Sequence, residues 1–142
     1  TCCQLVSQPT LKLRPLQSFG AYSGSALGLA TDAHRKHLAL TADDSVVSIW
    51  NTKTLICTAV VDRFDQPATA LSFSADGKLL ASAFAYKGKT NNGFIDIADV
   101  STGRQIRIIR AVEQEVFTVC WHPTKHVLVY CGLSNIVTVV SV

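Results

Sequence analysis

The sequence contains an internal repeat, and this feature limits the possible folds more than any other. Three similar segments begin at Asp32, Ser74 and His122, and they read DAHRKHLALTADDSVVSIWN, SADGKLLASA followed by GFIDIAD, and HPTKHVLVYCGLSNIVTVV. Their starts lie 42 and 48 residues apart, and the longer interval holds six extra residues between Phe84 and Gly93. A repeat of about 42 residues is one supersecondary unit that stacks on its copies, so the sequence predicts an array of like units.

Each unit breaks down into short runs typical of β-strands. In the middle unit the runs are 70–73, 79–83, 94–98 and 105–109, and in the flanking units they are 27–31, 38–41, 46–50, 55–61, 117–121, 127–131 and 136–140. Asp76-Gly77 separates the first two runs of the middle unit, where a tight turn needs a residue with φ > 0. No segment shows a capped 3.6-residue period. The sequence therefore predicts an all-β chain of about three and a half four-stranded antiparallel β-propeller blades.

The predicted blades divide the chain. Residues 1–26 are expected to end a preceding blade, 27–61 and 69–110 to form complete blades, and 117–142 to form a partial blade. Residues 85–92 are expected to be an exposed insert that takes no part in the core. A ring needs four to eight blades to close, and the chain holds no Met, so we expect it to belong to a larger propeller.

The unit around Trp50 resembles the WD repeat. SVVSIWN (45–51) is similar to the strand that ends in Trp-Asp in that family, and Asp44 lies six residues before Trp50, where the family has a buried turn aspartate. The Trp position holds Ala98 and Val140 in the other units, and the Asp position holds Asn92 and Ser134. The resemblance implies structural roles for Asp44 and Trp50, and the turn analysis adds a structural role for Gly77.

A closer resemblance covers almost the whole chain. PATALSFSADGKLLASA (67–83), FIDIADVSTG (94–103) and FTVCWHPTKHVLVYC (117–131) are similar to the WD-repeat subunits of THO complexes. This resemblance implies a nuclear, non-catalytic scaffold that binds other THO subunits and the RNA helicase and export adaptor of TREX. Such a scaffold would couple transcription and mRNA processing to nuclear mRNA export. The alternatives are another nuclear WD-repeat adaptor, either a ubiquitin-ligase substrate receptor or a histone-binding propeller.

Other classes of function find little support in the sequence. No run is long and apolar enough for a membrane helix, and no nucleophile motif or phosphate loop is present, so we expect no enzyme, no cofactor and no small-molecule substrate. Cys120, His122, His126 and Cys131 have a spacing that could hold zinc, but strand alternation separates them, so we expect no metal. Cys57, Cys120 and Cys131 lie in apolar runs and are expected to be buried, reduced thiols.

The charge surplus is local. The chain has 13 Lys and Arg against 10 Asp and Glu, and the excess falls within residues 86–110. This segment holds Tyr86, Lys87, Lys89, Arg104, Arg107 and Arg110, with Asp96 and Asp99 counted against them. One interpretation is contact with a partner or with RNA, where Tyr86 stacks and the cations attract phosphates. The other is a solvated rim that protects an edge strand from pairing.

Overall fold

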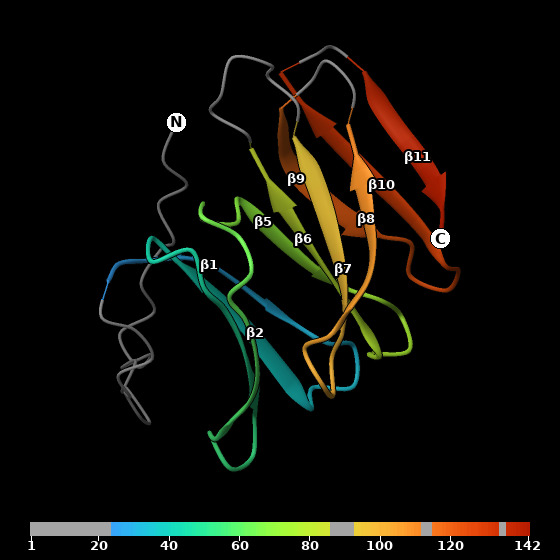
Figure 1. Ribbon diagram of the computed structural model, residues 1–142. Helices are drawn as coiled ribbons and strands as arrows, with labels where there is room; N and C mark the ends of the chain where they lie inside the picture. Colours follow the sequence, from blue (N-terminus) through green and yellow to red (C-terminus); the bar gives the residue numbers. More distant parts are fainter. Residues whose placement is uncertain (1–23, 86–92, 112–114, 134–135) are drawn as a thin grey trace, which may run out of the picture.

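A computed structural model describes residues 24–85, 93–111, 115–133 and 136–142, and all its regular elements are β-strands. The first sheet has the order β1(Ala26–Thr31), β2(His37–Ala42), β3(Val47–Asn51) and β4(Cys57–Val61). The second has β5(Ala70–Phe73), β6(Leu79–Phe84), β7(Phe94–Asp99) and β8(Gln105–Arg110). The third has β9(Val116–Trp121), β10(Val127–Gly132) and β11(Val137–Ser141). Consecutive strands pair antiparallel within each sheet (Figure 1), which confirms the predicted fold class.

The strand registers repeat from sheet to sheet. Leu38 lies opposite Trp50 in the first sheet, Leu80 opposite Ala98 in the second, and Leu128 opposite Val140 in the third. Trp50, Ala98 and Val140 therefore occupy equivalent positions one residue before the end of β3, β7 and β11. This equivalence is the one predicted from the repeat, although the three side chains differ in size.

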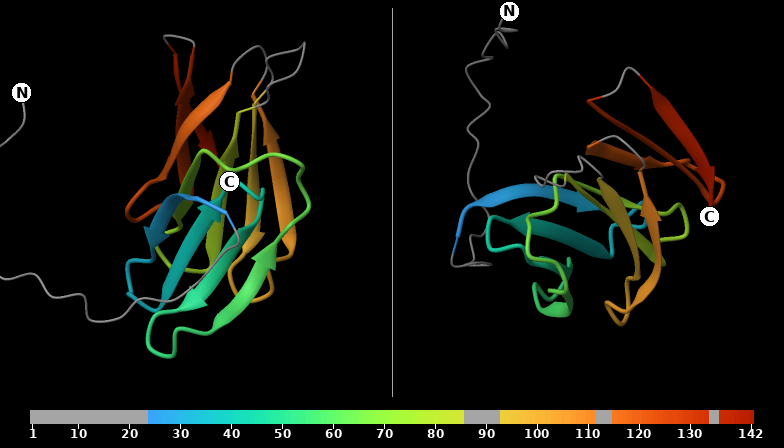
Figure 2. Two further views of the ribbon diagram at one scale, coloured as in Figure 1. Left: turned by 90° about the vertical axis from the view of Figure 1, so that its left-hand side faces the viewer. Right: turned by 45° about the horizontal axis from the view of Figure 1, so that its top comes forward.

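The three sheets stack face to face around two hydrophobic cores (Figures 1 and 2). The core between the first and second sheets includes Ile49, Leu80 and Phe84, and the core between the second and third includes Ile97 and Trp121. The second sheet is therefore covered on both faces, which agrees with the mostly apolar sequences of its central strands β6 and β7. The inner strands β1, β5 and β9 lie next to one another, which is the arrangement around a propeller axis.

Polar side chains also join neighbouring sheets near these inner strands. Thr69 Oγ1 donates to the Val116 carbonyl at 3.0 Å, and the Trp121 amide donates to Ser72 Oγ at 3.0 Å. Hydrogen bonds are directional, so these two restrict how the second and third sheets can slide on each other, which apolar contacts alone restrict less. In the part of the chain that the structure describes, no helix is long and apolar enough to cross a membrane.

The turn between β5 and β6 has the predicted left-handed glycine. Gly77 has φ of 70°, and its amide donates to the Ser74 carbonyl at 2.9 Å. In the β1–β2 turn Arg35 occupies the same position: its amide donates to the Asp32 carbonyl at 3.0 Å and its φ is 56°. Left-handed backbone is unfavourable for a residue with a Cβ atom. Glycine therefore suits the β5–β6 turn, whereas the arginine in the β1–β2 turn adopts this backbone at a cost in free energy.

Replacing Gly77 by alanine is expected to lower the free energy of unfolding by about 1–3 kcal/mol. The alanine would have to keep a left-handed backbone, and its Cβ would lie 3.0 Å from Asp32 Oδ2. Gly28→Ala is the matched control, because at Gly28 the nearest atom to a new Cβ is the Thr41 methyl group at 3.3 Å. Urea denaturation of both variants would measure the difference, and an equal effect at the two glycines would contradict this account of the turn.

Three expectations were wrong. Asp44 is exposed rather than buried, because it lies in the β2–β3 turn and its Oδ1 accepts a hydrogen bond from the Val46 amide at 3.1 Å. Cys57 and Cys131 are half-buried and Cys120 is exposed, since the apolar run 117–121 alternates and Cys120 lies on the face of β9 without a neighbouring sheet among the described residues. Ala85, assigned to the insert, is 9% exposed and belongs to the core.

Candidate functional site

The residues predicted to contact a partner divide into two groups. Tyr86, Lys87 and Lys89 lie outside the described residues. Arg104, Arg107 and Arg110 are all exposed, the first in the β7–β8 turn and the others on the outermost strand of the second sheet.

The arginines on β8 do not share one face of the sheet. Arg107 lies opposite Ile97, which belongs to the core shared with the third sheet. Arg110 lies opposite Phe94, which packs on the core shared with the first sheet. Since directly opposite residues point to the same side of a sheet, Arg107 and Arg110 point to opposite sides. Both therefore remain candidates for separate contacts, as exposed cations on an edge strand.

A buried carboxylate holds the connection between the first two sheets. Asp96 in β7 is fully buried; its Oδ2 accepts from Arg63 Nη2 at 2.6 Å and its Oδ1 accepts from Gln105 Nε2 at 2.8 Å. Arg63 Nη1 also donates to the Gly103 carbonyl at 2.9 Å. Both carboxylate oxygens thus have charged or polar partners, as burial of a charge requires. Asp96 therefore fixes the β4–β5 connection against β7 and β8 and does not contribute to a binding surface.

The residue after Arg63 strengthens this attachment. The centroid of the Phe64 ring lies 4.6 Å from that of the Phe84 ring and 4.8 Å from that of the Phe94 ring. The Arg63 guanidinium carbon lies 5.7 Å from the centre of the Phe64 ring, within range of a cation–π interaction. A polar and an aromatic contact from adjacent residues therefore anchor one connection, and this gives the loops of the first two sheets a fixed relative position.

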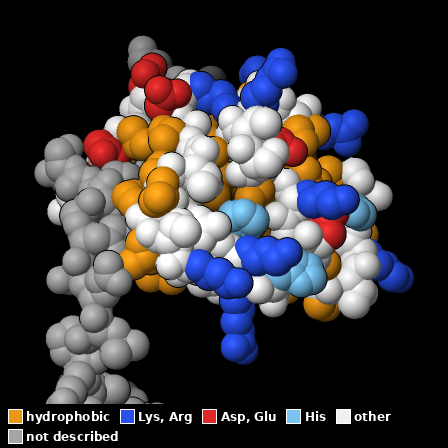
Figure 3. Space-filling view, turned by 90° about the horizontal axis from the view of Figure 1, so that it is seen from below, with side chains coloured by type: hydrophobic (Ala, Val, Ile, Leu, Met, Phe, Trp, Pro, Cys, Tyr) orange, Lys and Arg blue, Asp and Glu red, His pale blue; other side chains and the backbone are white. Residues whose placement is uncertain are grey.

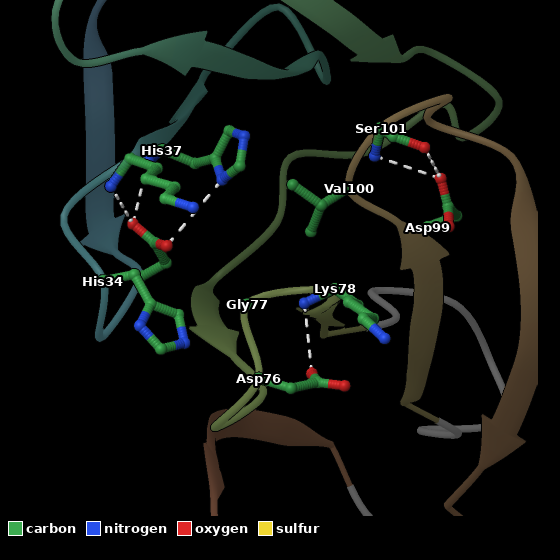
Figure 4. A pocket seen from close by; sticks show the side chains of 10 residues that line it. His34, His37, Asp76, Gly77, Lys78, Asp99, Val100 and Ser101 are labelled. Carbon is green, nitrogen blue, oxygen red and sulfur yellow. Dashed lines mark hydrogen bonds and ion pairs between the residues drawn. The ribbon is translucent and has the colours of Figure 1, made fainter.

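A pocket lies between three hairpin turns at one end of the strands (Figure 4). It has a volume of about 300 Å³ and is lined by the β1–β2, β5–β6 and β7–β8 turns. Asp32 is 3% exposed, and its Oδ1 accepts from the amides of Lys36 and His37 at 2.7 and 2.8 Å. Lys36 and Lys78 bring cations to the pocket, whereas Asp32, Asp76 and Asp99 bring carboxylates. This mixture of charges gives no strong preference for a small free anion.

Two of these carboxylates are held ionised by their own turns. The Ser74 hydroxyl donates to Asp76 Oδ1 at 2.6 Å, and the Lys78 amide donates at 3.1 Å, so the pKa of Asp76 lies below its ordinary value. The pKa of Asp99 is lowered chiefly by the Ser101 and Thr102 hydroxyls, which donate to its Oδ1 at 2.5 and 2.9 Å. Hydrogen bonds to the charged form favour that form.

The lowered pKa of Asp99 predicts an acid-sensitive contribution to stability. A depressed pKa in the folded state means that the stabilisation is present above the ordinary carboxyl pKa of about 4 and is lost as pH falls through the depressed value. Asp99→Asn should therefore melt below the wild type at pH near 7, and the difference should shrink as pH falls toward about 2. Asp65→Asn, at an exposed position, is the control and should change the melting temperature little. A difference for Asp99→Asn that is constant with pH would contradict the prediction.

The two histidines with zinc-like spacing have other neighbours. His122 Nδ1 accepts hydrogen bonds from the amides of Thr124 and Lys125, both at 3.2 Å, and so closes the β9–β10 turn. His126 Nε2 lies 4.0 Å from Asp76 Oδ2 in the neighbouring turn. Within residues 24–85, 93–111, 115–133 and 136–142, no three His, Cys, Asp or Glu side chains are placed to hold a metal ion.

Two features of the candidate site were missed from the sequence. The pair of Arg63 and Asp96 joins residues 33 positions apart, and no local pattern marks it. The gathering of turns around the pocket does have a usable signal: in a sheet of consecutive antiparallel strands, every second connection lies at the same end. By this rule the turns that begin near 32, 52, 74, 99 and 122 form one group, which the strand order alone is enough to identify.

The comparisons with known proteins agree on the fold. No protein-family model matches the chain. The sequence is 30% identical over 129 residues to THO complex subunit 3 of Arabidopsis thaliana, a match that covers 91% of this chain and 38% of that protein. The chain thus spans well under half the length of this curated relative.

Two solved propellers are similar in structure. The Cps50 (Swd1) β-propeller domain of Myceliophteria thermophila matches with a TM-score of 0.71 and 21% identity, over 85% of this chain and 37% of that one. The WD40 repeats of RRP9 match with a TM-score of 0.77 and 18% identity, over 87% and 37% of the two chains. At identities this low, the similarity to these two structures shows the fold and says nothing about function. The chain is therefore a fragment of a WD40 β-propeller by its fold, and its sequence is similar to that of THO complex subunit 3.

Proposed function

We propose that this chain is part of a non-catalytic scaffold subunit of a nuclear THO complex. The observation that carries the proposal is the sequence identity of 30% to THO complex subunit 3, which extends over 91% of the chain. In this role the protein binds the other THO subunits, together with the RNA helicase and the export adaptor of TREX. The assembly couples transcription and mRNA processing to nuclear mRNA export.

The proposed mechanism is rigid presentation of surface loops. Apolar cores join neighbouring sheets on both faces of the second sheet, and the pair of Arg63 and Asp96 fixes a connection between them. Rigid scaffolds bind partners with little loss of conformational entropy, because the contacting residues are already ordered. Partners would accordingly contact turns, connections and exposed edge residues such as Arg107 and Arg110 without a large change in the propeller.

Affinity purification from cells that carry a tagged form of the protein tests this proposal. THO subunits and the TREX helicase are expected to copurify in amounts close to that of the tagged protein. Recovery of cullin adaptors or of histones instead would favour a ubiquitin-ligase receptor or a histone-binding propeller. Absence of THO subunits from the purified material would overturn the proposed role.

The same purification can test the predicted contact residues. Replacing Tyr86, Lys87 and Lys89 together by alanine should reduce recovery of a THO partner if these residues form a contact. A second variant replaces Arg107 and Arg110, which are exposed on β8, and tests these two predicted contacts separately. Unchanged recovery with the first variant would leave the scaffold role intact and remove residues 86–89 from its interface.

A further inference from the structure

Five hairpin turns come together at one end of the strands and form a single surface, here called the turn face. It consists of residues 32–36, 52–56, 74–78, 99–104 and 122–126. The Thr52 amide donates to the Lys36 carbonyl at 3.0 Å, and the Val100 amide donates to the Lys78 carbonyl at 2.9 Å. His126 Nε2 of the β9–β10 turn lies 4.0 Å from Asp76 Oδ2 of the β5–β6 turn, and the pocket lies between the β5–β6 turn and the β1–β2 turn. These contacts and the shared pocket link all five turns across the three sheets.

The turn face carries an excess of positive charge. Its six Lys and Arg residues are all exposed: Arg35, Lys36, Lys53, Lys78, Arg104 and Lys125. All four histidines of the chain lie on or directly beside it. Its three carboxylates are Asp32, which is buried, and Asp76 and Asp99, which accept hydrogen bonds from their own turns. Figure 3 shows the Lys, Arg and His side chains gathered across this end of the molecule.

Two described connections at the opposite end of the strands are acidic. The connections 43–46 and 62–69 hold four exposed carboxylates, at Asp43, Asp44, Asp62 and Asp65. Arg63 is the one Lys or Arg in these two connections, and it is bound to Asp96. The turn face is thus basic and these two connections are acidic, a difference that favours approach of a polyanion to the turn face over approach to these connections. This difference cannot be seen when charges are summed along the sequence.

The backbone at Arg35 is in the left-handed region, as it also is at Leu55 on the turn face and at Ser45 in the opposite connection 43–46. Arg35 has φ of 56°, whereas glycine occupies the equivalent position at Gly77. An arginine in the left-handed region costs free energy that glycine would not, and residues held in such conformations are concentrated at functional sites. Arg35 thus adds an exposed cation to the turn face at a position where glycine would be less costly.

We propose that the turn face binds single-stranded nucleic acid through its phosphates. The cations are spread over five turns around a pocket that also holds carboxylates, so they suit a chain of phosphates better than one small anion. Binding of this kind needs dispersed Lys and Arg residues, and exposed imidazoles such as those of His34 and His126 can stack on bases. A protein partner would instead require a central apolar or aromatic anchor; on the turn face Ile56 is the large hydrophobic residue that is exposed. The proposal does not depend on membership of a THO complex.

The test measures binding of the whole chain to a fluorescent oligouridylate of about 20 nucleotides. The first variant replaces Lys53, Lys78 and Lys125 by alanine; each side chain is exposed, in a different turn. The control replaces Lys87, Lys89 and Arg110 by alanine, which removes the same charge outside the turn face. Thermal melting of both variants checks that they fold, and Lys53→Ala alone provides a milder test.

Wild-type protein is expected to bind with an affinity that falls steeply between about 50 and 200 mM salt. The turn-face variant should bind at least about tenfold more weakly, and its salt slope should fall by about 2, since each phosphate contact to a single strand contributes about 0.7. The control should bind within about twofold of the wild type. Equal weakening by the two triple variants, or no binding by the wild type at low salt, would overturn the proposal. Polyglutamate that displaces the RNA at equal charge would assign the face to an acidic protein and would also overturn it.

Discussion

Replacing Asp96 by alanine is expected to lower the free energy of unfolding by about 3 kcal/mol, among the largest effects of any single polar substitution in this chain. The carboxylate is fully buried and accepts hydrogen bonds at both oxygens. Its removal leaves the Arg63 guanidinium without its charged partner, and the Arg63 side chain is only 28% exposed. Water can reach part of that side chain, which keeps the expected loss near the lower end of the range for a broken buried pair.

Asp62→Ala is the matched control for Asp96→Ala. Asp62 is exposed and lies beside Arg63 in the same connection, so its replacement should change the free energy of unfolding by no more than about 0.5 kcal/mol. Urea denaturation would measure both variants, with Arg63→Leu and the double variant completing a thermodynamic cycle. A coupling of about 1–3 kcal/mol between Arg63 and Asp96 is expected. The stabilising role of the pair of Arg63 and Asp96 would be refuted if Asp96→Ala lowered the free energy of unfolding no more than Asp62→Ala.

The role of Asp96 also marks a limit of what the sequence can predict. FIDIADV reads as an alternating strand, and a sum of charges along the sequence makes Asp96 a surface charge that offsets the neighbouring arginines. Its true partner, Arg63, lies in a different sheet's connection 33 residues earlier. Alternation predicts which face of a strand a residue occupies, but not which face is covered by a charged neighbour. That information depends on how two sheets are stacked.

Features set by short-range geometry are predicted well. The turn at Gly77 has φ of 70°, and the runs at 70–73 and 127–131 match β5 and most of β10. These follow from turn chemistry and from a repeat that returns the same pattern three times. The burial that the family resemblance implies for Asp44 is wrong, since the residue is exposed, whereas its structural role in the β2–β3 turn stays a prediction.

The basic turn face could be predicted only in part from the sequence. Its residues come from turns that the repeat locates correctly, yet a sum of charges along the sequence points to residues 86–110. Arg104 is the one cation of that segment that also belongs to the turn face. In a sheet of consecutive antiparallel strands, the β1–β2 and β3–β4 connections lie at one end and the β2–β3 connection at the other. Sorting charges by this rule separates the basic turn face from the acidic connections 43–46 and 62–69.

The largest apolar effect is expected at Phe84. Phe84→Ala should lower the free energy of unfolding by about 3–5 kcal/mol. The side chain is fully buried, its ring stacks on Phe94 with centroids 4.8 Å apart, and it lies 4.6 Å from the ring of Phe64. Its removal would leave a cavity where the first sheet, the β4–β5 connection and the second sheet meet. Because Phe64 is next to Arg63, the same cavity would loosen the anchor of the buried ion pair.

Phe117→Ala provides the same chemical change at a site that is 43% exposed, and it should cost less than about 1 kcal/mol. Phe84→Leu should recover most of the loss, since it restores much of the volume without the ring contacts. Urea denaturation with an unchanged m-value would show that the three variants differ in stability and not in the denatured state. Equal losses for Phe84→Ala and Phe117→Ala would mean that the contact between the first two sheets does not hold the array together. In that case the first sheet should unfold separately, in a transition that precedes the loss of the second and third.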